Sequence, residues 1–345
     1  MIVAEEDPLT DARSTAPGRL GWGILGPGRI APRIVRALAG NPRGALRAVA
    51  GRDPDRARAF AERHGVPTTH PTFATLLADP AIDVVYVALP NGLHAEWTVR
   101  ALDAGKHVLC EKPLALSVAE VDDIAAAADR NDRIAVEAFM YLHHPQTIRA
   151  LEIVASGALG EIQVVSSAFS FYLSQENDPR IDPGLGGGSL WDVGCYPVSI
   201  SRRIAGQEPD AIGAFGRFDE HGVDRSFVGQ MRFPGGLLAH FESGFTAPDR
   251  ERVEIVGSEA TLVVDHPFLP EPDGPAPSLR ILREDAEEER VEVASVDQYR
   301  AEVDDLQAAI LDGSRPRVDL AFSRGGIATL VALDRAARSP TGTAD

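Results

Sequence analysis

Two segments far apart in the chain carry side chains that could move a proton. One holds Lys112 at the end of a short apolar run, and the other holds Asp192 and Tyr196. Lysine is rare in this chain, because Lys106 and Lys112 are the only lysines among its 34 basic residues. A lysine kept in this turn indicates a task for a compact ammonium with rotatable donors, which a planar guanidinium cannot perform. The alternative is an ordinary surface lysine at a strand end.

The second segment is rich in glycine over residues 184–188 and shows a helical pattern from Ser189. A helix would place Asp192 and Tyr196 one turn apart on the same face, where the carboxylate could orient the tyrosine as a proton donor. The alternative is a plain helix face whose tyrosine hydroxyl finds any acceptor. An unperturbed tyrosine has a pKa of about 10, too high for a base at neutral pH, and we expect a nearby ammonium to favour the tyrosinate.

A third segment, near the start of the chain, has the pattern of a dinucleotide-binding turn. It follows an apolar run at residues 20–25, precedes a helical pattern, and reads Gly26, Pro27, Gly28, Arg29, Ile30 and Ala31. In this pattern Gly26 permits a tight turn, Gly28 lets the backbone approach a pyrophosphate, and Ala31 lets the helix pack on the strand.

The end of the next apolar run predicts which dinucleotide binds. NAD usually meets an Asp or Glu there, about 20 residues beyond the glycines. This chain has Gly51, which leaves room, and Arg52, which could pair with a 2′-phosphate through a charge-assisted fork. The sequence therefore favours NADP over NAD. We expect Asp53 to cap a helix that begins near Pro54.

The elements that must position these groups alternate between strands and helices up to residue 140. Continuous apolar strands between amphipathic helices indicate a parallel sheet covered on both faces, and ligands bind at the C-terminal ends of such strands. That edge receives Leu89, Pro90 and Asn91 from one strand and Glu111, Lys112 and Pro113 from the next. We therefore predict a Rossmann domain over residues 19–140.

After residue 140 the apolar pattern changes to period two, with Gly, Pro and Asp turns between the segments. This pattern predicts an open, mostly antiparallel sheet, and two helical patterns at 296–311 and 321–338 close the chain. The predicted fold is thus α/β, with an N-terminal Rossmann domain and a C-terminal α+β domain at 141–345. We assign substrate binding and oligomerisation to the second domain and allow its last helices to pack back on the first.

Composition narrows the function classes further. The chain has 345 residues, 51 acidic against 34 basic, and a net charge of −17, which argues against nucleic acid and anionic membranes as partners. Cys110 and Cys195 form no C-x-x-C pair and no cluster at metal-ligand spacing, so we predict no metal and a reducing, cytoplasmic location. Residues 1–18 lack the features of a signal peptide and are interpreted as a disordered leader.

Together with His94 and the run at residues 137–141, these motifs resemble the Gfo/Idh/MocA oxidoreductases over about residues 19–338. The pattern Asp192-x-Gly-x-Tyr196 is similar to the one found in a particular branch of the family. This branch contains glucose-fructose oxidoreductase, NADP-dependent D-xylose dehydrogenase, dimeric dihydrodiol dehydrogenase and the 3-ketoreductases of deoxysugar pathways. The resemblance implies that Lys112 contacts the nicotinamide ribose and the reacting hydroxyl, that Tyr196 exchanges the proton and that Asp192 positions the pair. It also implies a homodimer or homotetramer formed through the C-terminal sheet. The cofactor contacts that it adds are Leu89, Pro90, Asn91, His94 and Glu111.

One position departs from this branch, and two others are candidates for substrate binding. Leu142 stands where the branch often has an arginine. Arg180 could bind a substrate hydroxyl or phosphate, or hold its own loop. His144, next to His143, could face the substrate, and the alternative for both is a solvated loop histidine.

The predicted function is NADP-dependent hydride transfer to or from a hydroxyl or carbonyl carbon of a sugar or cyclic polyol, nucleotide-linked ketosugars included. The alternatives are an aldose or trans-dihydrodiol dehydrogenase, a sugar–sugar oxidoreductase that keeps its cofactor bound, and a non-catalytic NAD(P)-binding regulator.

Overall fold

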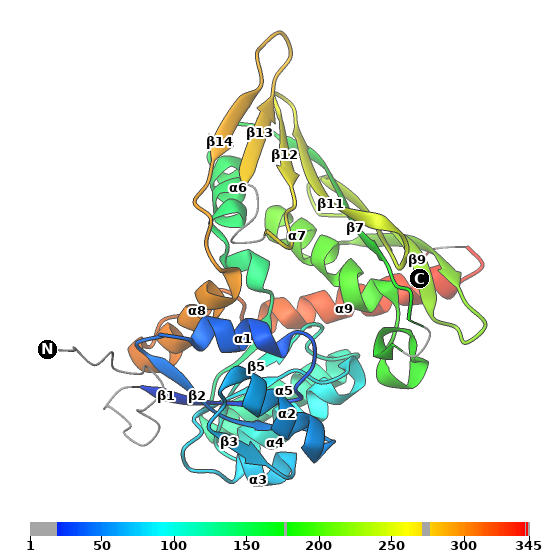
Figure 1. The fold of residues 1–345 in the computed structure, drawn as a ribbon. Helices are drawn as coiled ribbons and strands as arrows, with labels where there is room; N and C mark the ends of the chain where they lie inside the picture. Colours follow the sequence, from blue (N-terminus) through cyan, green and yellow to red (C-terminus); the bar gives the residue numbers. More distant parts are fainter. Residues whose placement is uncertain (1–18, 176–177, 271–276, 342, 344–345) are drawn as a thin grey trace, which may run out of the picture.

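The computed structural model describes residues 19–175, 178–270, 277–341 and 343, so the leader expected at residues 1–18 lies outside the described residues. Figure 1 shows two layers: the first domain, in blue and cyan, and a second sheet, in green to orange, on the other side of a set of helices.

The first sheet has the Rossmann topology that the sequence predicts. Its six parallel strands are ordered β3-β2-β1-β4-β5-β6. The strands are β1 (Leu20–Leu25), β2 (Gly44–Ala50), β3 (Thr68–His70), β4 (Val84–Val87), β5 (His107–Glu111) and β6 (Ala135–Ala138). The order reverses between β1 and β4, which creates a crevice at their C-terminal ends. Every residue of β1 and β4 is buried, as expected for a sheet that is covered on both faces.

Five helices connect these strands: α1 (Ala31–Leu38), α2 (Pro54–His64), α3 (Phe73–Leu77), α4 (His94–Asp103) and α5 (Val118–Asn131). The predicted cap of α2 is confirmed, because the Asp53 carboxylate accepts hydrogen bonds from the main-chain N–H groups of Asp55 at 3.0 Å and Arg56 at 3.2 Å. The expected helices differ from those of the structure by a residue or so at their ends.

The second sheet is mostly antiparallel, as predicted. Its order is β14-β13-β12-β11-β7-β10-β9-β8, and only the β7–β10 pairing is parallel. The strands are β7 (Ile162–Tyr172), β8 (Ala211–Phe218), β9 (Asp224–Arg232), β10 (Leu238–Gly244), β11 (Thr246–Gly257), β12 (Thr261–Asp265), β13 (Ser278–Leu282) and β14 (Glu289–Glu292).

The helices of the second domain lie between its sheet and the first domain (Figure 1). They are α6 (Pro145–Ala155), α7 (Cys195–Ala205), α8 (Gln298–Asp312) and α9 (Leu320–Arg338). The short turns are η1 (Asn91–Leu93), η2 (Met140–His143), η3 (Pro179–Ile181), η4 (Pro183–Leu185) and the π turn η5 (Leu190–Gly194). Helix α9 packs on β8 and also on α5, while α8 packs on α1. The opposite face of the sheet carries exposed Phe215, Val228 and Leu238. None of the described helices is long and apolar enough to span a bilayer.

Candidate active site

The turn after β1 has the shape that a pyrophosphate requires. Gly26 has a φ of 93°, and a Cβ added there would lie 2.5 Å from the carbonyl oxygen of Ala88, so only glycine fits. A Cβ on Gly28 would meet only that same oxygen, at 3.7 Å, which leaves one side of the backbone open. No side chain caps the start of α1. The turn therefore fits the phosphates of a dinucleotide.

The end of β2 is crowded for the acidic side chain that NAD prefers, so the room expected at Gly51 is wrong. Gly51 is buried, and a Cβ added there would lie 3.0 Å from Cδ of Pro27. Arg52, the next residue, is exposed. A crowded glycine followed by an exposed guanidinium fits a 2′-phosphate better than a free ribose hydroxyl.

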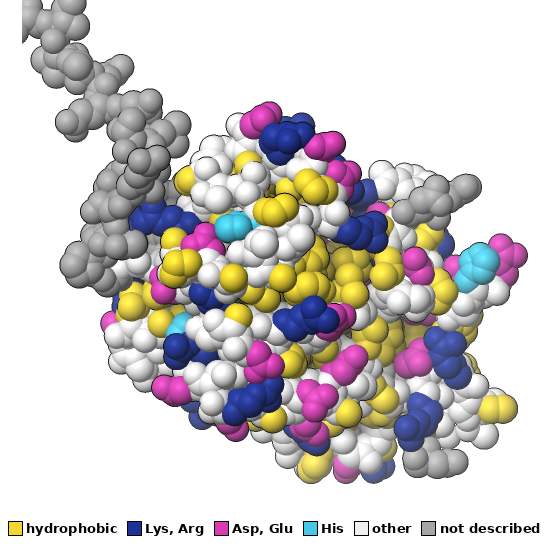
Figure 2. All heavy atoms as spheres, turned by 90° about the horizontal axis from the view of Figure 1, so that it is seen from below, with side chains coloured by type: hydrophobic (Ala, Val, Ile, Leu, Met, Phe, Trp, Pro, Cys, Tyr) yellow, Lys and Arg dark blue, Asp and Glu magenta, His cyan; other side chains and the backbone are white. Residues whose placement is uncertain are grey.

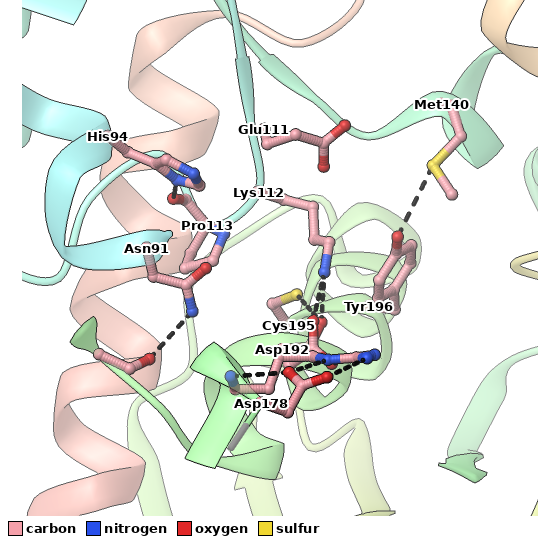
Figure 3. Close-up of polar contacts among 12 residues, drawn as sticks. Asn91, His94, Glu111, Lys112, Pro113, Met140, Asp178, Asp192, Cys195 and Tyr196 are labelled. Atoms are coloured by element: carbon pink, nitrogen blue, oxygen red, sulfur yellow. Dashed lines mark hydrogen bonds and ion pairs between the residues drawn. The ribbon is translucent and has the colours of Figure 1, made fainter. Parts of the chain in front are cut away.

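His94 connects the two loops that carry the other expected cofactor contacts. Its buried ring places Nε2 2.7 Å from the carbonyl oxygen of Leu89 and Nδ1 2.7 Å from that of Pro113. Burial lowers the pKa of His94. A neutral imidazole has one N–H, so His94 lies between the loops after β4 and β5 and donates to one of these two oxygens. Asn91 joins the same edge to the second domain, because its Nδ2 donates to the carbonyl oxygen of Gly186 at 2.9 Å (Figure 3).

Lys112 and Asp192 form an ion pair across the two domains. Lys112 Nζ lies 2.9 Å from Oδ1 of Asp192 and 2.7 Å from its main-chain oxygen (Figure 3). Burial is the largest single influence on the pKa of Lys112 and would lower it, but the acidic groups around the ammonium, with Asp192 first among them, together hold this pKa above its ordinary value. The ammonium therefore stays charged. Glu111, beside it, accepts a hydrogen bond from the hydroxyl of Tyr86.

Asp192 and Tyr196 are arranged differently from the sequence expectation. The helix expected from Ser189 begins as the π turn η5, and α7 starts only at Cys195. A π turn is wider than an α turn, so residues four apart no longer stack on one face. The Tyr196 hydroxyl instead donates to the Met140 sulfur at 3.7 Å, and the Lys112 ammonium lies 5.2 Å from the centre of the tyrosine ring. Asp192 thus positions Lys112, which in turn faces Tyr196.

The surroundings of Tyr196 favour its neutral form. Its ring is 4% exposed and packs against the rings of Phe139, Phe169 and Phe268. Burial raises the pKa of Tyr196 well above its ordinary value. This direction is opposite to the expected effect of the ammonium, and burial is its largest cause. A buried neutral hydroxyl holds a proton that it can donate.

Arg180 reaches the same cluster from η3. Its Nη1 lies 3.8 Å from Oδ2 of Asp192, and its Nε and Nη2 donate to the two carboxylate oxygens of Asp178 at 2.9 and 3.0 Å. The structure therefore brings Lys112, Asp192, Tyr196 and Arg180 together at one place between the domains.

The two histidines after β6 are buried, so their interpretation as solvated loop residues is wrong. His144 caps α6, where its Nδ1 accepts from the main-chain N–H of Gln146 at 3.1 Å. His143 Nδ1 lies 3.9 Å from Oδ2 of Asp305. Burial lowers the pKa of His143 to about 3 and that of His144 to about 4. These contacts give no support to the expected role of His144 in substrate binding.

Sequence reasoning missed three partners of the site. Tyr86 is the only residue of β4 with a polar group, and this could have marked it within an apolar strand. Asp178 and Arg180 lie on either side of Pro179, a spacing that suits an ion pair between near neighbours in the chain. Met140 carries no comparable signal, because a methionine after an apolar strand is ordinary core.

Neither cysteine suits nucleophilic chemistry, and no metal cluster is formed by the residues described. Both thiols are buried, and burial raises the pKa of Cys110 and of Cys195. Within the described ranges no group of three or more His, Cys, Asp and Glu side chains could hold a metal ion.

Comparison with known proteins gives two family matches and many relatives. Residues 20–139 match the model of the oxidoreductase family with an NAD-binding Rossmann fold, and residues 147–263 match the GFO/IDH/MocA C-terminal domain. The NADP(+)-dependent D-xylose 1-dehydrogenase 2 of Haloferax volcanii is 38% identical over 327 residues, which cover 92% of this chain and 97% of that protein.

Two solved structures are similar over nearly the whole chain. The 3-ketoreductase KijD10 of Actinomadura kijaniata, in complex with NADP and TDP-benzene, has a TM-score of 0.86 at 31% identity and covers 91% of this chain and 96% of its own. The aldose-aldose oxidoreductase of Caulobacter crescentus, complexed with glycerol, has a TM-score of 0.85 at 29% identity and covers 93% of this chain and 98% of its own.

Proposed function

The chain belongs to the Gfo/Idh/MocA family of oxidoreductases, and from this premise we propose that it uses NADP to interconvert a hydroxyl and a carbonyl group on a sugar or cyclic polyol. The observation that carries the proposal is the Lys112–Asp192 ion pair beside the Tyr196 ring, at the C-terminal edge of the Rossmann sheet. This edge is where a dinucleotide binds in such sheets.

NADP is favoured over NAD by the end of β2. The crowded position of Gly51 argues against an acidic partner for a ribose hydroxyl, and Arg52 is exposed beside it. The relatives support this choice, because the Haloferax enzyme is named for NADP(+) and KijD10 was crystallised with NADP. We assign the phosphates to the turn from Gly26 to Ala31, and the loops on either side of His94 to the rest of the cofactor.

Each residue of the cluster has a chemical role in this proposal. When bound, NADP supplies the hydride chemistry. Tyr196 holds its proton at Oη and donates it to the substrate oxygen as a carbonyl is reduced, and it takes the proton back in the reverse reaction. Lys112 stays charged and hydrogen-bonds the same oxygen, while Asp192 fixes the direction of its ammonium.

Substitution of Lys112 by Met and of Tyr196 by Phe tests this mechanism. Each change should lower kcat by roughly 100- to 10,000-fold, the usual contribution of positioned acid–base catalysis. Turnover is followed by the absorbance of NADPH with a sugar that the parent protein uses. Tyr172→Phe is the matched control, because Tyr172 is 69% exposed and should tolerate the change. Normal turnover in both site variants would contradict the proposal.

We also propose that two copies associate through the open face of the second sheet. The support is a row of apolar side chains on that face, where Phe215 of β8 pairs with Val228 of β9 and both are exposed. Exposed apolar neighbours of this kind are typical of interaction surfaces.

A further inference from the structure

On the side of Lys112 away from the turn at residues 26–31, the positive and negative side chains balance one another. This side holds two cations, Lys112 and Arg180, and two carboxylates, Asp178 and Asp192. The side chains of Lys112 and Asp192 are only 13% and 14% exposed, and that of Asp178 is 3% exposed. Each cation therefore has a carboxylate partner; the Lys112 pair and Asp178 are largely shielded from water, where such pairs are strong, while the side chain of Arg180 is 30% exposed.

Arg180 is held too firmly to act as an unpaired phosphate ligand. Asp178 accepts from its Nε and Nη2, and also from its main-chain N–H at 3.0 Å. These bonds occupy the fork of the guanidinium that would otherwise grip a phosphate. The remaining nitrogen, Nη1, points towards Asp192, and the guanidinium carbon lies 5.1 Å from the centre of the Phe171 ring.

Arg29, the other cation near Asp178, belongs to the cofactor side. It follows Gly28 in the turn assigned to the phosphates, and its Nη2 lies 3.4 Å from Oδ2 of Asp178. Arg29 therefore shares Asp178 with Arg180, and we assign its charge to the cofactor side because it lies in the turn proposed for the phosphates. Over the face seen in Figure 2, basic and acidic side chains alternate, and the whole chain carries a net charge of −17. The net charge of the chain therefore adds no long-range attraction for a further dianion beyond that of the local cations.

The same groups suit hydroxyls well. A guanidinium N–H beside a carboxylate oxygen offers one donor and one acceptor, and a sugar hydroxyl needs both. Phe171 adds an apolar ring next to Arg180. Resting on the proposed function, we propose that the substrate is an uncharged sugar or cyclic polyol whose hydroxyls are held by Arg180 and Asp192, and that Asp178 excludes nucleotide-linked sugars by neutralising Arg180.

Asp178→Asn tests the inference through binding, without any need for turnover. Titration calorimetry measures the affinity of thymidine diphosphate for the protein saturated with NADP. The parent should bind this probe with a Kd weaker than about 1 mM, and Asp178→Asn should tighten it at least about tenfold, because Arg180 regains an unshared charge. Asp182→Asn is the matched control: it removes the same charge two residues beyond Arg180 and should change the Kd by less than about twofold. Micromolar binding by the parent, or no gain in Asp178→Asn, would overturn the inference.

A second variant covers the case in which Asp178→Asn does not fold. Arg180→Gln should raise the KM for a neutral sugar by about tenfold or more, and leave the weak binding of thymidine diphosphate unchanged. An unchanged KM would overturn the inference, as would loss of thymidine diphosphate binding by this variant. If Lys112→Met and Tyr196→Phe keep full activity, the proposed function fails instead, so the two failures are distinguishable.

Discussion

At the scale of single residues, the two lysines of this arginine-rich chain serve different purposes. Lys106 donates to the main-chain oxygens of Asp79 at 2.9 Å and Ile82 at 2.8 Å, so it ties a loop to the end of α4. Lys112 bonds Asp192 of the other domain. Rarity marked both residues in the sequence, but only the position of Lys112 at the ligand edge of a parallel sheet distinguished the catalytic candidate. The ion pair joins residues 80 apart, and the family resemblance implied that Asp192 positions Lys112 but not which atoms would meet.

Glu137, a buried carboxyl behind the site, should make stability depend on pH. It accepts from the main-chain N–H of Leu114 at 2.9 Å, and burial raises its pKa to about 7. In the unfolded chain a glutamate loses its proton near pH 4.3. Between these two pH values the folded state holds more protons than the unfolded state, so the free energy of unfolding falls as pH rises, by up to about 3 kcal/mol.

Glu137→Gln should remove this loss, because glutamine cannot ionise and still accepts the hydrogen bond. Urea unfolding at pH 5 and pH 8 measures the effect, and the fall between them should be smaller in the variant by about 2–3 kcal/mol. The exposed Glu259→Gln is the control and should keep the parent's pH dependence. An identical fall in Glu137→Gln would mean that this carboxyl is already ionised at pH 5.

At the scale of elements, hydrophobic periodicity predicted the buried strands and the long helices, while elements without a clear period gave no signal. Buried strands and long helices were found with small errors at their ends. The strands β3, β13 and β14 have a weak sequence signal because they are short and lie at or near the edge of a sheet, with mostly polar or charged residues in β3 and β14. The π turn η5 was missed, since its sequence reads as an α-helix, and this is why the relation between Asp192 and Tyr196 was wrong.

Helix α9 contains a glycine whose role is visible only in the packing. A Cβ on Gly325 would overlap Nη2 of Arg202 and Oε1 of Glu208. Arg202 is buried and donates to Glu208 at 2.7 Å and to the carbonyl oxygen of Phe322 at 2.9 Å. The glycine therefore makes room for a buried guanidinium beneath α7.

Gly325→Ala should destabilise the protein by about 1–3 kcal/mol through this overlap, although alanine is the better helix former by about 1 kcal/mol. Thermal or urea unfolding measures the change. Gly326→Ala is the control. The nearest atom to its added Cβ would be Nη1 of Arg202 at 3.1 Å, so it should lower the free energy of unfolding by less than Gly325→Ala does. A gain in stability from Gly325→Ala would show that Arg202 moves aside without cost.

At the scale of the whole molecule, the site exists only because the two domains meet. Lys112 and Asn91 come from the first domain, and their partners Asp192 and Gly186 come from the second. Each of these two hydrogen bonds joins residues that are at least 80 positions apart in the sequence. The family resemblance predicted that these segments would meet, while the atoms that touch depend on how the domains dock.

The open face of the second sheet predicts the assembly state. We expect the parent to be at least a dimer in light scattering at micromolar concentration, and Phe215→Asp to shift it towards the monomer, because a carboxylate would be buried without a partner in the interface. Leu311→Asp, on α8 and 36% exposed, is the control for adding a charge elsewhere. A parent that is already monomeric would remove the basis for an interface on this sheet.

The packing of α8 on α1 affects how the protein is made. Asn41, just beyond α1, donates to Asp304 of α8 at 2.8 Å across 263 residues of chain. A ribosome adds roughly 5–20 residues per second, so α1 and the dinucleotide turn leave the exit tunnel more than about ten seconds before their covering helix is synthesised. During that interval the side of α1 that packs on α8 in the finished protein stays uncovered.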